Sequence, residues 1–185
     1  MDKNLKEKII SLFEKVRDIP YGDIGSRNPD DVLKMNKGTC SGKHELLKKL
    51  FIEIGVEVKD FIVMHTFNDL NVNYPENIKE ILKRTEISDP HNFIKILVDE
   101  KWLTVDATWD KPLKGLGFPI NENWDGESNM DLCVAEGEKI FEVDDPISSK
   151  KEEINKFPEN VKKDRRIFLQ ELTKWLDSCR SSNKY

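Results

Sequence analysis

Apolar residues recur every three or four positions in several stretches of the chain, which is the spacing of one buried helix face. Local signals bound some of these stretches. Asn28 followed by Pro29 marks a helix start, and Gly55 stands where a left-handed C-terminal residue belongs. We therefore predict helices over residues 2–18, 29 to about 37, 40 to about 54 and 76–83, and a last helix that begins after residue 158.

Other stretches have the composition and alternation of β-strands. Residues 91–98 and 101–108 flank Asp99-Glu100 and predict an antiparallel hairpin. Residues 56–64 predict one more strand, and residues 130–135 and 139–143 a second hairpin that turns at Glu136-Gly137. Helices that come first, antiparallel strands in the second half and one closing helix predict an α+β fold.

Length and composition narrow the class of protein. A chain of 185 residues is most simply one domain, residues 1–185, large enough to bury a core. Its 30 basic and 35 acidic side chains give a net charge of −5, and no basic stripe with interleaved aromatic residues predicts a nucleic-acid partner. No apolar run approaches the ~18 residues of a membrane span, so we expect no membrane partner. Three widely spaced cysteines favour a reducing, cytoplasmic location.

Cys40 has the local context of a reactive thiol. Gly38 allows a sharp approach to the third predicted helix and Thr39 can cap it, which places Cys40 at the first helical position. The free backbone N–H groups and the positive dipole end of a helix favour thiolate over thiol there. With a basic group in reach, the pKa of such a thiol falls from ~8.5 toward neutrality or below.

The hairpin decides which histidine can serve as the base. A two-residue turn at positions 99 and 100 places His91 opposite Thr108 and diagonal to Asp106. A turn one residue earlier places His91 directly opposite Asp106. Both registers put the two side chains on one face of the sheet, with their β-carbons ~4.5–8 Å apart. An imidazole oriented by a carboxylate, with a thiol in reach, is the arrangement of a catalytic triad.

Several residues compete with this assignment. His44 lies four positions after Cys40 on the same helix and can reach its thiol, but no acid nearby orients it. Asp110 can replace Asp106 if the strand runs longer. His65, at a strand end, is either solvated or structural, and core packing is expected for Cys133 and Cys179. A zinc site made by Cys40, His44, His65 and Cys133 lacks the paired ligand spacing of known sites, so we expect no metal.

The stretch from residue 109 to 130 is rich in glycine, proline and asparagine and predicts a long loop. A loop of this length inside a compact domain is more often functional than idle. Trp109 and Trp124 are its candidates for substrate binding, as walls of a cleft. The competing interpretation is that both tryptophans pack beneath the loop.

From about residue 31 to residue 110 the chain resembles the transglutaminase-like superfamily, whose fold is a circularly permuted relative of papain-like cysteine proteases. Three ordered motifs carry the resemblance: Gly38-Thr39-Cys40 before an amphipathic helix, His91-Asn92-Phe93, and Asp106-Ala107-Thr108. The resemblance implies a nucleophile helix packed on an antiparallel sheet, with flanking N- and C-terminal helices. It also implies Cys40 as nucleophile, His91 as general base and acid, and Asp106 as the orienting acid.

The function expected from these residues is cysteine-dependent acyl transfer through a thioester, by a thiol peptidase or amidase or by a transglutaminase-like transferase. Its substrate would be a peptide, a protein or a small amide, with no organic cofactor; the calcium requirement of some family members is not carried over. No side chain stands out as a second oxyanion donor. Two further hypotheses are a catalytically silent transglutaminase-like domain that binds a peptide or protein, and an arylamine-type acetyltransferase, for which no coenzyme A site is evident.

Overall fold

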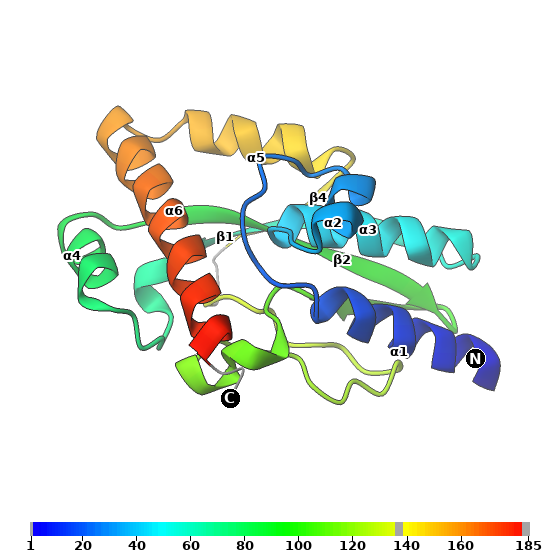
Figure 1. Ribbon diagram of the computed structural model, residues 1–185. Coiled ribbons are helices and arrows are strands. Elements are labelled where there is room, and N and C mark those ends of the chain that lie inside the picture. Colours follow the sequence, from blue (N-terminus) through cyan, green and yellow to red (C-terminus); the bar gives the residue numbers. More distant parts are fainter. Residues whose placement is uncertain (1, 136–138, 183–185) are drawn as a thin grey trace.

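The computed structural model describes residues 2–135 and 139–182, which form a four-stranded antiparallel sheet with flanking helices (Figure 1). The predicted α+β fold class is confirmed. The strands are β1 (Val58–Thr66), β2 (Ser88–Val98), β3 (Lys101–Val105) and β4 (Ile140–Val143), in the spatial order β3-β2-β1-β4. The helices are α1 (Lys3–Arg17), α2 (Pro29–Met35), α3 (Cys40–Glu53), α4 (Glu76–Arg84), α5 (Pro146–Asn155) and α6 (Glu159–Ser182), with short 3-10 turns η1 (Phe67–Asp69) and η2 (Lys111–Leu116).

The predicted helices α1, α2, α3, α4 and α6 lie close to their expected bounds. The start of α2 follows its sequence signal, since the Asn28 side chain accepts a hydrogen bond from the backbone N–H of Asp30. Gly55, just past α3, has a φ of 81°, the left-handed conformation expected of it.

Helix α5 is missing from the sequence prediction. Its start resembles that of α2, because Asp145 precedes Pro146 and its carboxylate accepts hydrogen bonds from the backbone N–H groups of Ile147 and Ser148. Only Pro146 is buried in this helix, so no apolar stripe accompanies the cap. A cap signal without periodicity was the only evidence for α5 in the sequence.

The β2–β3 hairpin has the first of the two turns that the sequence allows, the two-residue turn at positions 99 and 100. Its register runs from Ile94 opposite Val105 to Val98 opposite Lys101, and Asp99 and Glu100 have φ values of 46° and 63°. Positive φ at both central positions matches the right-handed twist of the flanking strands. β3 ends at Val105, earlier than predicted, because beyond it the backbone N–H of Ala107 donates to the side chain of His44 rather than to a strand.

The second predicted hairpin is wrong. β4 pairs with β1, from Asp60 opposite Val143 to Val63 opposite Ile140, and residues 130–135 form no strand. Within that stretch the N–H of Cys133 donates to the Asp106 carboxylate and its carbonyl accepts from the Trp109 indole. The apolar residues there pack into the core instead, with Met130, Cys133 and Val134 each in an apolar cluster. The predicted turn at residues 136–137 lies outside the described residues.

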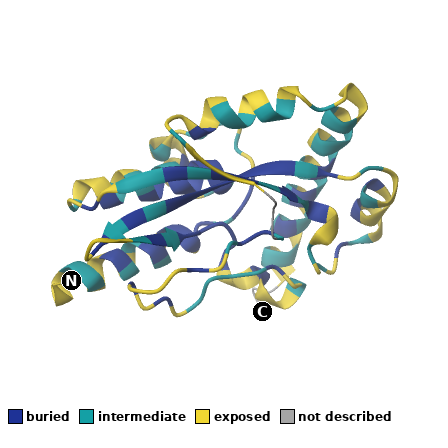
Figure 2. Ribbon diagram, turned by 180° about the vertical axis from the view of Figure 1, so that it is seen from behind, coloured by how far each residue is buried: buried dark blue, intermediate teal, exposed yellow. Residues whose placement is uncertain are grey.

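Most of the buried apolar residues belong to two clusters. The first joins α1 and α3 to one side of the sheet, and includes Ile94, Ile96 and Val98 with Leu103 and Val105, as the hairpin register requires. The second joins α4, α6 and the loop after β3. Figure 2 shows the sheet from behind, with buried residues concentrated along its central strands. In the parts of the chain that the structure describes, no helix combines the length and apolarity needed to cross a membrane.

Candidate active site

Cys40 is the first residue of α3, as predicted, and a close backbone approach places it there. Gly38 forms an isolated parallel bridge with Tyr21, and a β-carbon at position 38 would come within 3.2 Å of the side chains of Lys43 and Val32. Thr39 is the N-cap residue, but its hydroxyl makes no capping bond, so this part of the prediction is wrong. The dipole end of α3 therefore acts on Cys40 through backbone groups alone.

His91 and Asp106 meet on one face of the sheet, as the hairpin register predicts. His91 Nε2 lies 2.7 Å from Asp106 Oδ2, and both side chains are buried. The carboxylate also accepts hydrogen bonds from the N–H and hydroxyl of Thr108 and from the N–H of Cys133, at 2.6 to 3.1 Å. Both carboxylate oxygens are thus occupied, which fixes the imidazole and leaves His91 Nδ1 for another partner.

The Cys40 thiol and His91 shift each other's pKa, so the two groups are coupled. Burial would raise the pKa of Cys40, but the Lys150 ammonium and the hydrogen-bonded His91 lower it to about 5. Burial would likewise lower the pKa of His91, but the Asp106 carboxylate and the Cys40 thiolate raise it to about 9. The lowered pKa of Cys40 and the raised pKa of His91 both favour the thiolate–imidazolium pair, which is the reactive form of a cysteine nucleophile.

Lys150 is a part of the site that sequence reasoning missed, because it lies on α5. Its Nζ is 3.3 Å from Cys40 Sγ and 4.0 Å from a carboxylate oxygen of Asp89. Asp89 in turn forms an ion pair with Arg165 of α6. The ammonium of Lys150 therefore lies between a thiolate and a carboxylate, and stabilises the charged form of the thiol.

We expect Lys150→Gln to raise the pKa of Cys40 by about one unit or more, because a unit charge next to the thiolate is lost. The pH dependence of iodoacetamide labelling measures this pKa. Lys156→Gln, which removes an exposed charge just past the end of α5, is the matched control and should leave the profile unchanged. An identical midpoint in Lys150→Gln and the wild type would refute this role of Lys150.

His44 does not stand where a base would. Its Nδ1 lies 2.8 Å from the carbonyl oxygen of Cys40, and its Nε2 accepts a hydrogen bond from the N–H of Ala107 at 2.9 Å. Burial lowers its pKa to about 4, so the ring is neutral with both nitrogens occupied. His44 thus ties the start of α3 to the end of β3.

Asp110 does not take the place of Asp106. It forms an ion pair with Arg180 at 2.6 Å and accepts a hydrogen bond from the backbone N–H of Tyr21. Asp110 therefore holds the segment before α2 against α6, and it is Asp106 that binds His91.

His65 and the two cysteines beyond Cys40 differ in burial. His65 is buried, not solvated, and burial lowers its pKa to about 3. Cys133 is buried, whereas Cys179 is partly exposed. No group of three or more histidine, cysteine or acidic side chains among the described residues could hold a metal ion.

The structure brings neither candidate tryptophan to the cavity that Cys40 lines. Trp109 is 2 % exposed, and its ring lies 4.3 Å from those of Tyr21 and Phe118. Trp124 is 7 % exposed and packs edge-on against Phe13. Both tryptophans therefore occupy core positions, the packing role that the sequence left open.

Tyr21 is a second residue that sequence reasoning missed, since Pro20-Tyr21-Gly22 appeared only as a helix stop. Its N–H donates to Asp110, its carbonyl accepts from Arg180, and its ring packs on Trp109. Burial and the nearby Cys40 raise the pKa of Tyr21 well above its usual value, so the phenol remains a proton donor.

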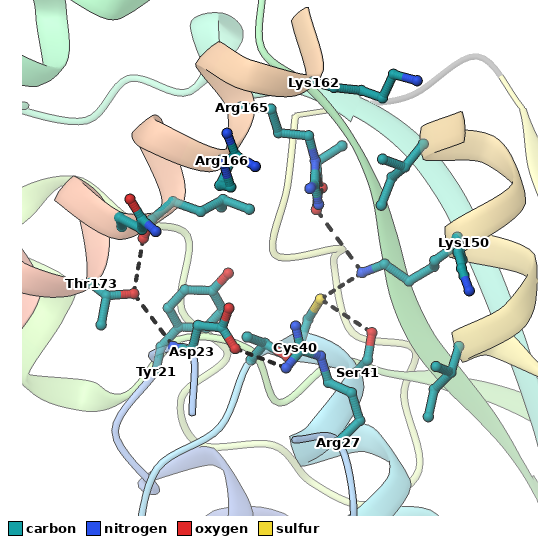
Figure 3. A pocket seen from close by; sticks show the side chains of 17 residues that line it. Tyr21, Asp23, Arg27, Cys40, Ser41, Lys150, Lys162, Arg165, Arg166 and Thr173 are labelled. Carbon is teal, nitrogen blue, oxygen red and sulfur yellow. Dashed lines mark hydrogen bonds and ion pairs between the residues drawn. The ribbon is translucent and has the colours of Figure 1, made fainter. Parts of the chain in front are cut away.

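Cys40 opens onto a cavity of about 530 Å³. Figure 3 shows its walls: the start of α3 with Cys40 and Ser41, the segment of residues 21–27, α5 with Lys150, and α6. Cys40 is only 4 % exposed, and it lines this cavity. A pocket of this size accommodates a few residues of a peptide or a small amide.

Comparisons with known proteins add little to this geometry. No family model matches the chain. No curated protein matches it either. One solved structure with a detectable likeness, from Cytophaga hutchinsonii, is described as a "putative cysteine protease"; it has a TM-score of 0.38 and 19% identity, and the match covers 59% of this chain and 33% of that one. The chain thus spans about a third of the length of this neighbour.

Proposed function

We propose that this chain is a cysteine-dependent acyl-transfer enzyme of transglutaminase-like type, with Cys40 as nucleophile, His91 as base and acid, and Asp106 as the orienting acid. One observation carries the proposal. His91 is held by Asp106 through Nε2 and is electrostatically coupled to the Cys40 thiol, which lies at the start of a helix that faces a cavity. Nucleophile, base and orienting group are arranged in that order.

In the first half-reaction the Cys40 thiolate attacks the carbonyl carbon of an amide. A C–S bond forms and the carbonyl oxygen takes up the negative charge. His91 then gives its proton to the amide nitrogen, the C–N bond breaks, and the amine leaves. Asp106 holds the ring in place throughout and stabilises its charged form. The product is a thioester on Cys40.

In the second half-reaction a water molecule or an amine attacks the thioester. Neutral His91 removes a proton from the attacking group, the new C–O or C–N bond forms, and the C–S bond breaks. The Cys40 thiolate leaves as a stabilised anion next to Lys150, and His91 is again protonated. Water gives a peptidase or amidase, and an amine gives a transferase.

The developing oxyanion needs donors at the start of α3. The first turn of a helix leaves its backbone N–H groups without intrahelical partners, and Cys40 and Ser41 of this turn line the cavity. We assign the Tyr21 hydroxyl as the side-chain donor. Tyr21 lines the cavity together with Cys40, and its high pKa keeps the phenol protonated while the thiolate forms. Its fixed backbone means that no reorganisation is needed when charge develops.

Tyr21→Phe is expected to lower kcat by about 10²-fold, the usual effect of removing one oxyanion donor, with little effect on KM. Steady-state kinetics on an amide substrate measures this split. Tyr74→Phe is the matched control, because Tyr74 is likewise buried in the second apolar cluster but does not line the cavity. Equal kinetics for Tyr21→Phe and Tyr74→Phe would contradict the assignment.

The alternative function is a silent domain that binds a peptide or protein in the same cavity. The small exposed fraction of Cys40, 4 %, is the observation that favours it. Incubation with libraries of peptides and small amides, followed by intact-protein mass spectrometry, separates the two. A thioester adduct on Cys40 supports the enzyme, and binding without any adduct supports the silent domain.

A further inference from the structure

The cavity beside Cys40 has a charge opposite to that of the whole chain. The chain carries a net charge of −5, yet the cavity is lined by six cationic side chains and only two carboxylates. Figure 3 shows several of these cations around the opening. They come from residues 21–27, α5 and α6: Arg27, Lys150, Lys151, Lys162, Arg165 and Arg166.

Some of these cations are already neutralised. Arg165 is paired with Asp89, and Arg27 lies 2.8 Å from Asp23. The ammonium of Lys150 lies next to the thiol of Cys40. Lys162 lies 2.5 Å from the exposed Glu159. Both carboxylates that line the cavity are therefore paired with cations of the same lining.

Lys151 and Arg166 have no such partner. No carboxylate in residues 2–135 or 139–182 forms an ion pair with either of them, and both are exposed. Lys151 belongs to α5 and Arg166 to α6, which form different walls of the cavity. Two uncompensated positive charges on separate walls attract an anion, and an arginine adds planar recognition of a carboxylate.

The rest of the lining fits a peptide-like ligand better than a phosphate. Ile147, Ile154 and Leu169 give both helices apolar groups beside the charges. No glycine is among the residues that line the cavity, so it lacks the glycine-rich loop on which phosphate sites are commonly built. Apolar groups alternating with cations suit an aliphatic chain that ends in a carboxylate.

We propose that the acyl substrate of Cys40 carries a carboxylate close to the amide that is attacked, and that Lys151 and Arg166 determine this specificity. The inference rests on the proposed acyl-transfer function. The carboxylate belongs either to an aspartate or glutamate side chain or to the C-terminus of a peptide.

Two alkylating reagents of the same size test the cavity without a known substrate. Iodoacetate is anionic and iodoacetamide is neutral. We divide the rate with iodoacetate by the rate with iodoacetamide, both for Cys40 and for a small free thiol. The first ratio divided by the second, called the normalised ratio, reports the electrostatic potential beside Cys40. We expect this normalised ratio to exceed one by about tenfold at low ionic strength and to fall with added salt. Lys151→Gln and Arg166→Gln should each lower it about threefold. Lys163→Gln, which removes an exposed charge of α6 outside the cavity, should leave it unchanged.

The outcomes separate the two proposals. One outcome is that iodoacetamide labels Cys40 rapidly at pH 6, while the normalised ratio is near one and is unchanged in Lys151→Gln and Arg166→Gln. This outcome overturns the carboxylate specificity and leaves the acyl-transfer proposal standing. Labelling that follows an ordinary thiol with a pKa of ~8.5 overturns the acyl-transfer proposal, and the specificity with it.

Protection experiments then identify the source of the carboxylate. Four peptides compete with iodoacetamide for Cys40. Three are N-acetylated peptide amides with glutamate, glutamine or phosphoserine at one position. The fourth is the glutamine peptide with a free C-terminus. Protection by the glutamate peptide assigns a side-chain carboxylate, and protection by the free C-terminus assigns an α-carboxylate. Best protection by the phosphoserine peptide, or equal protection by all four peptides, contradicts the proposal.

Discussion

Cys40→Ala is expected to abolish the covalent adduct and to lower turnover by about 10⁵-fold or more, on the order of what the loss of a nucleophile costs in other hydrolases. The reason is that no neighbouring group can replace the sulfur. The hydroxyl of Ser41 lies 3.9 Å from Sγ but has no base assigned to it. Burst kinetics with an activated ester, together with intact-protein mass, measures both effects.

Cys179→Ala is the control for this variant, because Cys179 is partly exposed and lies on α6 outside the cavity lining. It should retain both the adduct and full turnover. If Cys40→Ala turned over substrate at the rate of Cys179→Ala, Cys40 would not be the nucleophile and the proposed function would fail.

Asp106→Asn is expected to lower kcat by about 10⁴-fold, the effect of replacing the acid of a related triad. The groups that now donate hydrogen bonds to the Asp106 carboxylate are His91, Thr108 and the N–H of Cys133. The NH₂ group of an asparagine side chain is itself a donor and cannot accept from them. At least one of these groups would lose its acceptor, so His91 would turn or change its tautomer. We also expect the pKa of His91 to fall from about 9, because the Asp106 carboxylate raises it.

Stability must be measured beside activity in this variant. A buried group left without its partner costs about 1–3 kcal/mol, and thermal unfolding will show this loss. His91→Ala leaves the contacts of Asp106 to Thr108 and Cys133 in place, and so separates chemistry from folding. An Asp106→Asn protein that is folded and keeps wild-type kcat would rule out Asp106 as the orienting acid.

Local sequence signals were sufficient for the elements that hold the proposed triad. The turn at Asp99-Glu100 fixes the register of β2 and β3, and side chains alternate across a strand, so the shared face of His91 and Asp106 follows from position alone. Cys40 at the start of α3 follows from Gly38 and from the apolar stripe after it. These inferences involve neighbours along the chain or across one hairpin.

The walls of the cavity could not be predicted in this way. Lys150 reaches Cys40 from a position 110 residues away in the chain, on a helix that has a cap signal but a single buried residue. Tyr21 reaches the site because Asp110 and Arg180 hold its backbone from two distant segments. Trp109 and Trp124 were candidates for cleft residues, since the polar composition of the loop does not indicate which aromatic rings pack in the core.

The most direct test of the proposed triad is the pH dependence of Cys40 labelling by iodoacetamide in the wild type and in His91→Ala. The wild type should label with a midpoint near 5, because the thiolate persists down to that pH. His91→Ala should shift the midpoint upward, since the imidazolium that lowers the pKa of Cys40 is lost. A midpoint near ~8.5 in both proteins would show an ordinary thiol and would contradict the proposed mechanism.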